Sequence, residues 1–100
     1  YWTLSNFILE KDRHNMDGGA IRNTQVLMCS DNLTEWCIKD TVLTCDQPEL
    51  YGFQYVDWQF DGKDIVFVSR TAWRDKTGNP PRQHDANYMT FHRIRNFRAF

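Results

Sequence analysis

The sequence lacks long hydrophobic runs: its longest apolar stretches are four or five residues, such as 65–68. This length rules out a membrane-spanning helix. No segment keeps a 3.6-residue apolar period between capping residues, so we expect no substantial helix. A signal peptide is also missing, and the sequence begins with Tyr1 rather than Met. This start predicts a chain that was processed, trimmed or cut from something longer.

Metal-binding and cofactor-binding signatures are missing too. The three cysteines, Cys29, Cys37 and Cys45, lie eight residues apart, whereas a zinc ribbon needs close pairs of ligands. Because their number is odd, at least one stays unpaired or pairs between chains. We expect buried, reduced thiols, with a cross-strand Cys29–Cys37 disulfide as the alternative. The Asp-Gly-Gly segment 17–19 is too short for a phosphate loop, so we predict no metal and no cofactor.

What the sequence does contain is enough apolar residues for one small ordered domain. Of its 100 residues, 41% are hydrophobic, 15% aromatic and 25% charged, which argues against disorder. The net charge of −1 hides an asymmetry: residues 1–62 carry four basic and ten acidic side chains, and residues 63–100 carry eight and three. In the basic segment 92–98, charges alternate with Ile94 and Phe97. This alternation is typical of the solvated side of a strand, so we expect no nucleic-acid partner.

Six segments have the apolar–polar alternation or the β-branched composition of strands. Between the second and third lies a tight turn at 30–34, and Asp61-Gly62 between the fourth and fifth is a strong hairpin signal. Two long connections, 7–23 and 71–86, have the length of functional loops. The expected strands are residues 1–5, 24–29, 36–43, 53–60, 64–70 and 87–94.

The alternation of long and tight connections predicts an all-β fold built from antiparallel four-stranded propeller-blade units, A-B-C-D. Residues 1–45 supply strands B, C and D of one unit, and residues 51–100 supply strands A, B and C of the next. The chain would then be a single partial propeller domain with two incomplete blades. Both B–C loops would emerge on one face. The alternative is a self-contained small β-barrel or sandwich, for which six strands suffice.

Residues 30–36, Ser-Asp-Asn-Leu-Thr-Glu-Trp, resemble a degenerate Asp-box of sialidase-like β-propellers, and also the hairpin of arabinanase-type propellers. The Asp is one place early and the Gly is missing. In such a box an Asp closes the turn and the Trp packs between sheets. Residues 55–68 resemble the last sialidase blade, and nearly the whole chain is similar to the two carboxy-terminal blades of bacterial sialidase-family glycosidases.

This resemblance implies roles for two residues. Arg22 matches the family arginine that binds the carboxylate of sialic acid, and Tyr55 matches the nucleophilic tyrosine. A planar guanidinium suits a carboxylate, and a neutral phenol meets less repulsion from an anionic sugar than a carboxylate would. The family's general acid, its base and its other arginines belong to earlier blades. Asp57, two residues from Tyr55, would share its strand face and is a candidate proton partner or a structural carboxylate.

Four more residues are candidates for substrate binding. Arg70 would contact substrate or form an ion pair with Asp57 or Asp85. The adjacent His84 and Asp85 would form an acid–base or metal-binding pair, or brace the long loop. Trp73, in the same loop, is placed to stack on a sugar.

The resemblance therefore predicts the carboxy-terminal fragment of a secreted or periplasmic bacterial glycosidase. It would supply part of a central pocket for sialic acid or a related sugar. One hundred residues give only a sector of that pocket, so we expect the chain alone to be inactive. The alternative is a non-catalytic carbohydrate-binding or oligomerising module, because incomplete blades leave strand edges that self-associate.

Overall fold

The chain folds almost entirely into strands. The computed structural model describes residues 1–13 and 17–100. Within these residues no helix is long and apolar enough to cross a membrane. Three one-turn 3₁₀ helices, η1 (Glu10–Asp12), η2 (Gly18–Ala20) and η3 (Phe97–Ala99), accompany six strands: β1 (Trp2–Asn6), β2 (Thr24–Cys29), β3 (Cys37–Thr44), β4 (Gly52–Asp61), β5 (Asp64–Ala72) and β6 (Tyr88–Ile94).

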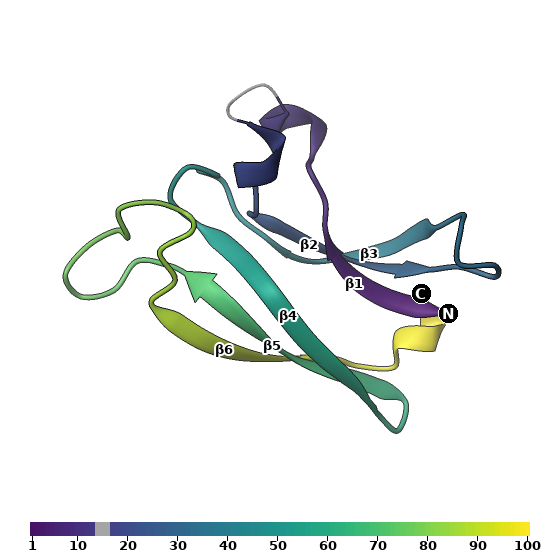
Figure 1. Ribbon diagram of the computed structural model, residues 1–100. Helices are drawn as coiled ribbons and strands as arrows, with labels where there is room; N and C mark the ends of the chain where they lie inside the picture. Colours follow the sequence, from purple (N-terminus) through teal and green to yellow (C-terminus); the bar gives the residue numbers. More distant parts are fainter. Residues whose placement is uncertain (14–16) are drawn as a thin grey trace.

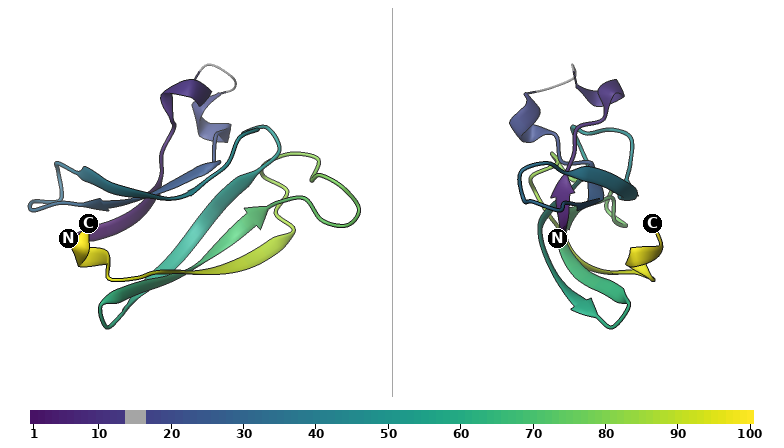
Figure 2. Two further views of the ribbon diagram at one scale, coloured as in Figure 1. Left: turned by 180° about the vertical axis from the view of Figure 1, so that it is seen from behind. Right: turned by 90° about the vertical axis from the view of Figure 1, so that its right-hand side faces the viewer.

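The strands form two antiparallel sheets, ordered β1-β2-β3 and β4-β5-β6. Figure 1 shows the two sheets as separate layers, and the views in Figure 2 show that neither curls into a closed barrel. The predicted all-β class and the number of strands are therefore confirmed. Each sheet has three strands, and no four-stranded blade forms among residues 1–13 and 17–100.

The core lies between the two sheets. Leu4 and Leu27 face it from the first sheet, and Ile65 and Phe67 face it from the second. Phe97 of η3 completes it, with its ring 5.0 Å from that of Trp2 in an edge-to-face contact. The Trp2–Phe97 contact thereby joins the carboxy-terminal segment to the amino-terminal strand, although the right-hand view of Figure 2 shows that the two chain ends themselves lie apart.

The turn between β2 and β3 differs from the expected Asp-box in two details: Asn32 closes the turn in place of the Asp, and Trp36 is bonded to its own turn rather than packed between the sheets. The Ser30 hydroxyl accepts hydrogen bonds from the two backbone N–H groups after Asp31, at 3.2 and 2.8 Å. The side-chain oxygen of Asn32, rather than that of Asp31, accepts the next two, at 3.0 and 2.9 Å. Trp36 is half-buried and donates its indole N–H back to the Leu33 carbonyl at 3.3 Å. The tryptophan thus braces the turn from which it comes.

A bulge interrupts β4 at Tyr55. Gln54 pairs with Arg70 and Asp57 pairs with Val68, so two residues of β4 stand opposite a single residue of β5. Tyr55 adopts the left-handed conformation, with φ of 49°, which costs an L-residue roughly 1–2 kcal/mol. Bulges of this kind redirect side chains and are common beside functional sites.

The cysteines are free, as expected. Cys29 and Cys37 are register partners across β2 and β3 but are not bonded. Cys37 is exposed, so the expectation of buried thiols was wrong for it, and Cys29 and Cys45 are only half-buried. Burial, reinforced by Asp46, raises the pKa of the Cys45 thiol to about 11.

Candidate functional site

A polar cavity of about 500 Å³ lies where the two sheets meet. This volume is within the usual range for small-molecule sites. Its walls come from β1, η2, the segment before β2, the first half of β4 and the loop between β5 and β6. It therefore gathers residues from both halves of the chain. The lining residues are Ser5, Asn6, Gly19, Arg22, Gln54, Tyr55, Gln83 and His84.

The backbone at Arg22 is tied to the second sheet. Its carbonyl accepts a hydrogen bond from the Phe53 N–H at 2.8 Å. The side chain of Asn6 donates to the carbonyls of both Arg22 and Phe53, at 3.4 and 3.0 Å. These bonds fasten the entry to β2 against the start of β4. The half-buried Arg22 side chain thus projects from backbone that is fixed on two sides.

Tyr55 lines the cavity from the second sheet, at the bulge of β4. Its side chain is 71% exposed, and the Arg70 guanidinium carbon lies 5.7 Å from the centre of its ring. Arg70 was expected to contact substrate or to pair with an acid. In the described part of the chain it forms an ion pair with neither Asp57 nor Asp85, and instead covers the tyrosine ring.

The buried side chain of Gln54 fastens the loop between β5 and β6, which forms another wall of the cavity. The Gln54 side chain is 3% exposed and donates its amide N–H to the Gln83 carbonyl at 2.5 Å. Its amide oxygen lies 3.0 Å from Nδ1 of His84. Gly52 permits this arrangement, because a Cβ there would lie 2.9 Å from the Gln83 carbonyl and 3.2 Å from Cβ of Arg22.

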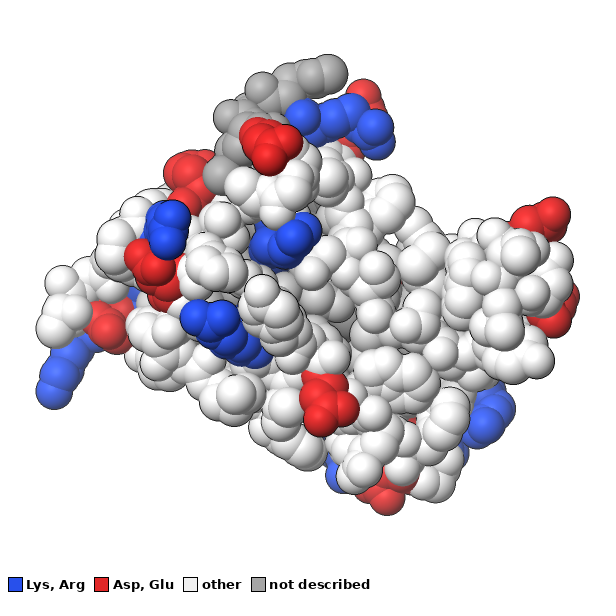
Figure 3. Space-filling view, in the orientation of Figure 1, with Lys and Arg blue, Asp and Glu red and all other residues white. Residues whose placement is uncertain are grey.

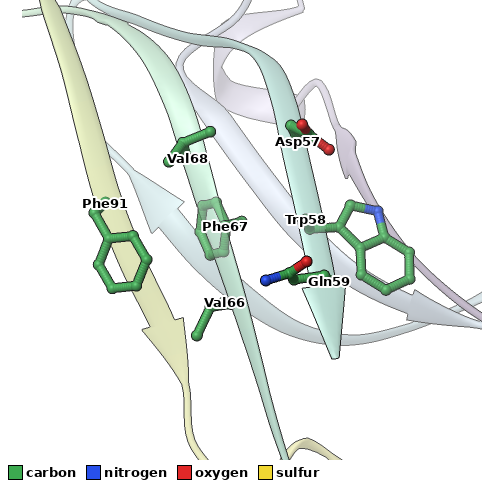
Figure 4. A pocket seen from close by; sticks show the side chains of 7 residues that line it. All are labelled: Asp57, Trp58, Gln59, Val66, Phe67, Val68 and Phe91. Atoms are coloured by element: carbon green, nitrogen blue, oxygen red, sulfur yellow. The ribbon is translucent and has the colours of Figure 1, made fainter. Parts of the chain in front are cut away.

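Three of the predicted site residues, Arg22, Tyr55 and His84, therefore line one cavity. Asp57 does not join them. It was expected to share a strand face with Tyr55, but the bulge breaks the alternation between the two residues. Asp57 lines a second, smaller hollow of about 230 Å³ on the outer face of the β4-β5-β6 sheet, beside its register partner Val68 and across from Phe91 (Figure 4).

Trp73 and Asp85 also lie elsewhere. The Trp73 ring is 4.5 Å from that of Tyr51 and lines a separate, largely apolar cavity of about 440 Å³ between the sheets, together with Tyr88. Asp85 pairs with Arg82 at 3.3 Å. The predicted His84–Asp85 pair is thus divided between a cavity wall and a surface ion pair.

Sequence reasoning missed three residues that line the cavity, Asn6, Gln54 and Gln83, and also Gly52, which makes room for them. Asn6, Gly52, Gln54 and Gln83 carry no motif. The one available signal was an uncharged polar residue, Gln54, inside an aromatic strand segment, since a buried amide needs partners. The length of the connection 71–86 marked it as a candidate functional loop, and this loop contributes Gln83 and His84 to the cavity wall.

The surface charge is mixed. Figure 3 shows basic and acidic side chains interspersed over the face it displays. Within residues 1–13 and 17–100, no cluster of three His, Cys, Asp or Glu side chains is arranged to hold a metal ion.

No family model, curated protein or solved structure matches this chain. The cavity is therefore interpreted from its own chemistry: one guanidinium, one phenol, one imidazole and several amides. Such a lining suits a small, polar, anionic ligand better than an apolar one.

Proposed function

We propose that the Arg22–Tyr55–His84 cavity binds a carboxylated sugar of the sialic acid class. The chain would be the carboxy-terminal part of a sialidase-like glycoside hydrolase and supply one sector of its central pocket. The observation that carries this proposal is the convergence of Arg22 and Tyr55, the two residues singled out by the family resemblance, on one polar cavity.

The chemistry of the two side chains fits this ligand. A guanidinium binds a carboxylate through two parallel hydrogen bonds. A phenol near the anomeric carbon acts as a nucleophile when a base removes its proton. Asp57 lines the other face of its sheet, so we assign it no part in that proton transfer. Among residues 1–13 and 17–100 no Asp or Glu lines the cavity, and we expect the chain to bind the sugar without cleaving it.

Titration with N-acetylneuraminic acid, followed through backbone amide chemical shifts, tests the proposal. We expect saturable shifts around residues 22, 54–55 and 83–84. Arg22→Ala should abolish them, and Trp73→Ala, in the separate apolar cavity, should leave them unchanged. Shifts confined to Trp73 and Tyr88, or none at all, would overturn the assignment.

A hydrolysis assay tests the inactivity of the isolated chain. A purified, demonstrably monomeric sample is incubated with a fluorogenic sialoside. We expect no turnover above the buffer rate. Efficient hydrolysis would show that the general acid is supplied within these 100 residues.

A second candidate, an oligomerising β module, rests on a different surface. Strand β6 exposes Met89 and Phe91, at 71% and 65%, and Phe91 lies across from its register partner Val68 on the outer face of the β4-β5-β6 sheet (Figure 4). Contiguous exposed apolar side chains of this kind favour association. Sedimentation velocity distinguishes the candidates: a stable oligomer that Phe91→Lys dissociates supports the module, and a monomer at all concentrations opposes it.

A further inference from the structure

The backbone carbonyl of Gln83 fixes the orientation of the Gln54 amide. A carbonyl oxygen only accepts hydrogen bonds, so the Gln54 atom 2.5 Å from it is the amide nitrogen. The other end of the amide, the oxygen Oε1, is therefore the atom that faces Nδ1 of His84 at 3.0 Å. An amide oxygen carries no proton, so the shared proton belongs to the histidine.

Burial makes this arrangement costly to break. Gln54 is 3% exposed, and among the described residues only His84, an exposed side chain, lies within hydrogen-bond distance of its amide oxygen. Leaving a buried acceptor without a donor carries the full desolvation penalty of that group. His84 is thereby held with its proton on Nδ1.

A neutral imidazole has one proton, so a proton on Nδ1 leaves Nε2 as an acceptor. Within the described residues no side chain or backbone group donates to Nε2 of His84. The guanidinium of Arg22, the charged group on the cavity wall, has only N–H donors and no acceptor. The amide nitrogens of Asn6 and Gln54 are already bonded to carbonyls.

We propose that His84 presents an unprotonated Nε2 to the cavity as the acceptor for a ligand hydroxyl group. The ligand then carries a carboxylate for Arg22 and, on a separate carbon, a hydroxyl that donates to His84, which is the chemistry of a polyhydroxylated sugar acid. The choice of ligand rests on the proposed function, but the state of the histidine does not.

The first test measures the tautomer in the ligand-free protein. At about pH 8, above the ordinary histidine pKa of about 6.5, two-bond ¹H–¹⁵N spectra distinguish protonated from unprotonated ring nitrogens. We expect Nδ1–H for His84 in the native chain. Gln54→Glu keeps an accepting oxygen for Nδ1–H but loses the N–H donated to Gln83, so it should keep the proton on Nδ1 at a cost in stability, whereas Gln54→Leu should lose this tautomer.

A spectrum of the native chain with the proton on Nε2 of His84 would overturn the inference, whatever the sugar does. His92, stacked on Phe67 at 4.9 Å, is an internal reference, since neither Gln54 variant should change its spectrum. Because the native chain alone settles the tautomer, a variant that fails to fold removes no information.

The second test adds N-acetylneuraminic acid. We expect the Nε2 resonance of His84 to move on saturation, and His84→Phe, which keeps a ring but no nitrogen, to weaken binding by roughly 3- to 10-fold, the range for one neutral hydrogen bond. Saturable binding with a stationary Nε2 resonance would overturn this inference and leave the proposed function intact. No binding at all would overturn the proposed function and the choice of ligand.

Discussion

The guanidinium carbon of Arg70 lies 5.7 Å from the centre of the Tyr55 ring, across the bulge between β4 and β5. A cation–π contact at an exposed site is worth about 0.5–1 kcal/mol, which is less than the backbone cost of the left-handed conformation at Tyr55. The contact therefore orients the ring without explaining why the bulge forms. The bulge follows from the pairing of β4 with β5, and it places Tyr55 in a left-handed conformation that is unfavourable for a residue with a side chain.

The left-handed conformation of Tyr55 predicts that glycine is more stable than alanine at this position, the reverse of the usual order in a strand. In ordinary strands Gly is less stable than Ala by roughly 0.5–1 kcal/mol. At position 55, where φ is 49°, we expect Tyr55→Gly to be more stable than Tyr55→Ala by about 1 kcal/mol, measured by urea denaturation. Both variants remove the ring, so their difference reports on the backbone. At Gln59, an exposed residue further along β4, the usual order should return. A more stable alanine variant at position 55 would refute the strain.

Gly52 should tolerate no side chain. A Cβ at this position would lie 2.9 Å from the Gln83 carbonyl oxygen, so Gly52→Ala must shift backbone rather than a flexible side chain. We expect a loss of about 1–3 kcal/mol in the free energy of unfolding, together with weaker sugar binding. The matched control is Gly19→Ala, where the nearest atom is 3.6 Å away and the change should stay within about 0.5 kcal/mol. Equal effects would show that the cavity wall is not tightly built at Gln83.

Asp64 should contribute stability that depends on pH. Its carboxylate accepts hydrogen bonds from the Asn96 N–H at 2.8 Å and from Arg93 at 3.0 Å, and these lower the pKa of Asp64, the Asn96 bond most strongly. A lowered native pKa gives stability that is present above the ordinary Asp value of about 3.9 and is lost as pH falls through the native value.

Thermal melts of Asp64→Asn and the native chain check this sign. At pH 7 the variant should melt at a lower temperature, and the difference should shrink as the pH falls below about 4. Asp31→Asn, in the exposed turn, should match the native chain throughout. A difference for Asp64→Asn that stays constant down to pH 2 would rule out a contribution from the ionised carboxylate.

Cys37 and Cys45 should differ in reactivity. Only the thiolate reacts with iodoacetamide, and burial raises the pKa of Cys45 to about 11. Cys37 is exposed, so at about pH 8 it should be alkylated well before Cys45, as followed by peptide mass spectrometry. In denaturant the two rates should converge. Equal rates in the folded chain would contradict the burial of Cys45.

Local sequence patterns predicted the strands well because the patterns and the packing agree. The expected strand 24–29 is β2, and 64–70 is most of β5, since each combines apolar, β-prone residues with clear turn signals. The same patterns could not show how many strands a sheet holds. That depends on which strand edges meet in space, and the structure has three strands in each sheet.

The candidate site was predictable only in part, for two physical reasons. Arg22 and Tyr55 came from a family resemblance, which requires no knowledge of the local backbone. The bulge at Tyr55 has no glycine or Asn-Gly signal, so the expected pairing of Tyr55 with Asp57 followed the regular alternation and was wrong. The support for His84 comes from Gln54, a residue 30 positions away, which no local pattern reveals.

The central claim is that Arg22 recognises the carboxylate of a sugar acid, and one comparison of affinities tests it. The dissociation constants of N-acetylneuraminic acid and its uncharged methyl ester are measured on the native chain and on Arg22→Gln. Because a hydrogen bond to a charged group is worth about 1.5–3 kcal/mol, we predict that the native chain binds the acid roughly 10-fold or more tightly than the ester. Arg22→Gln should lose this preference. Equal affinities on the native chain would contradict the claim.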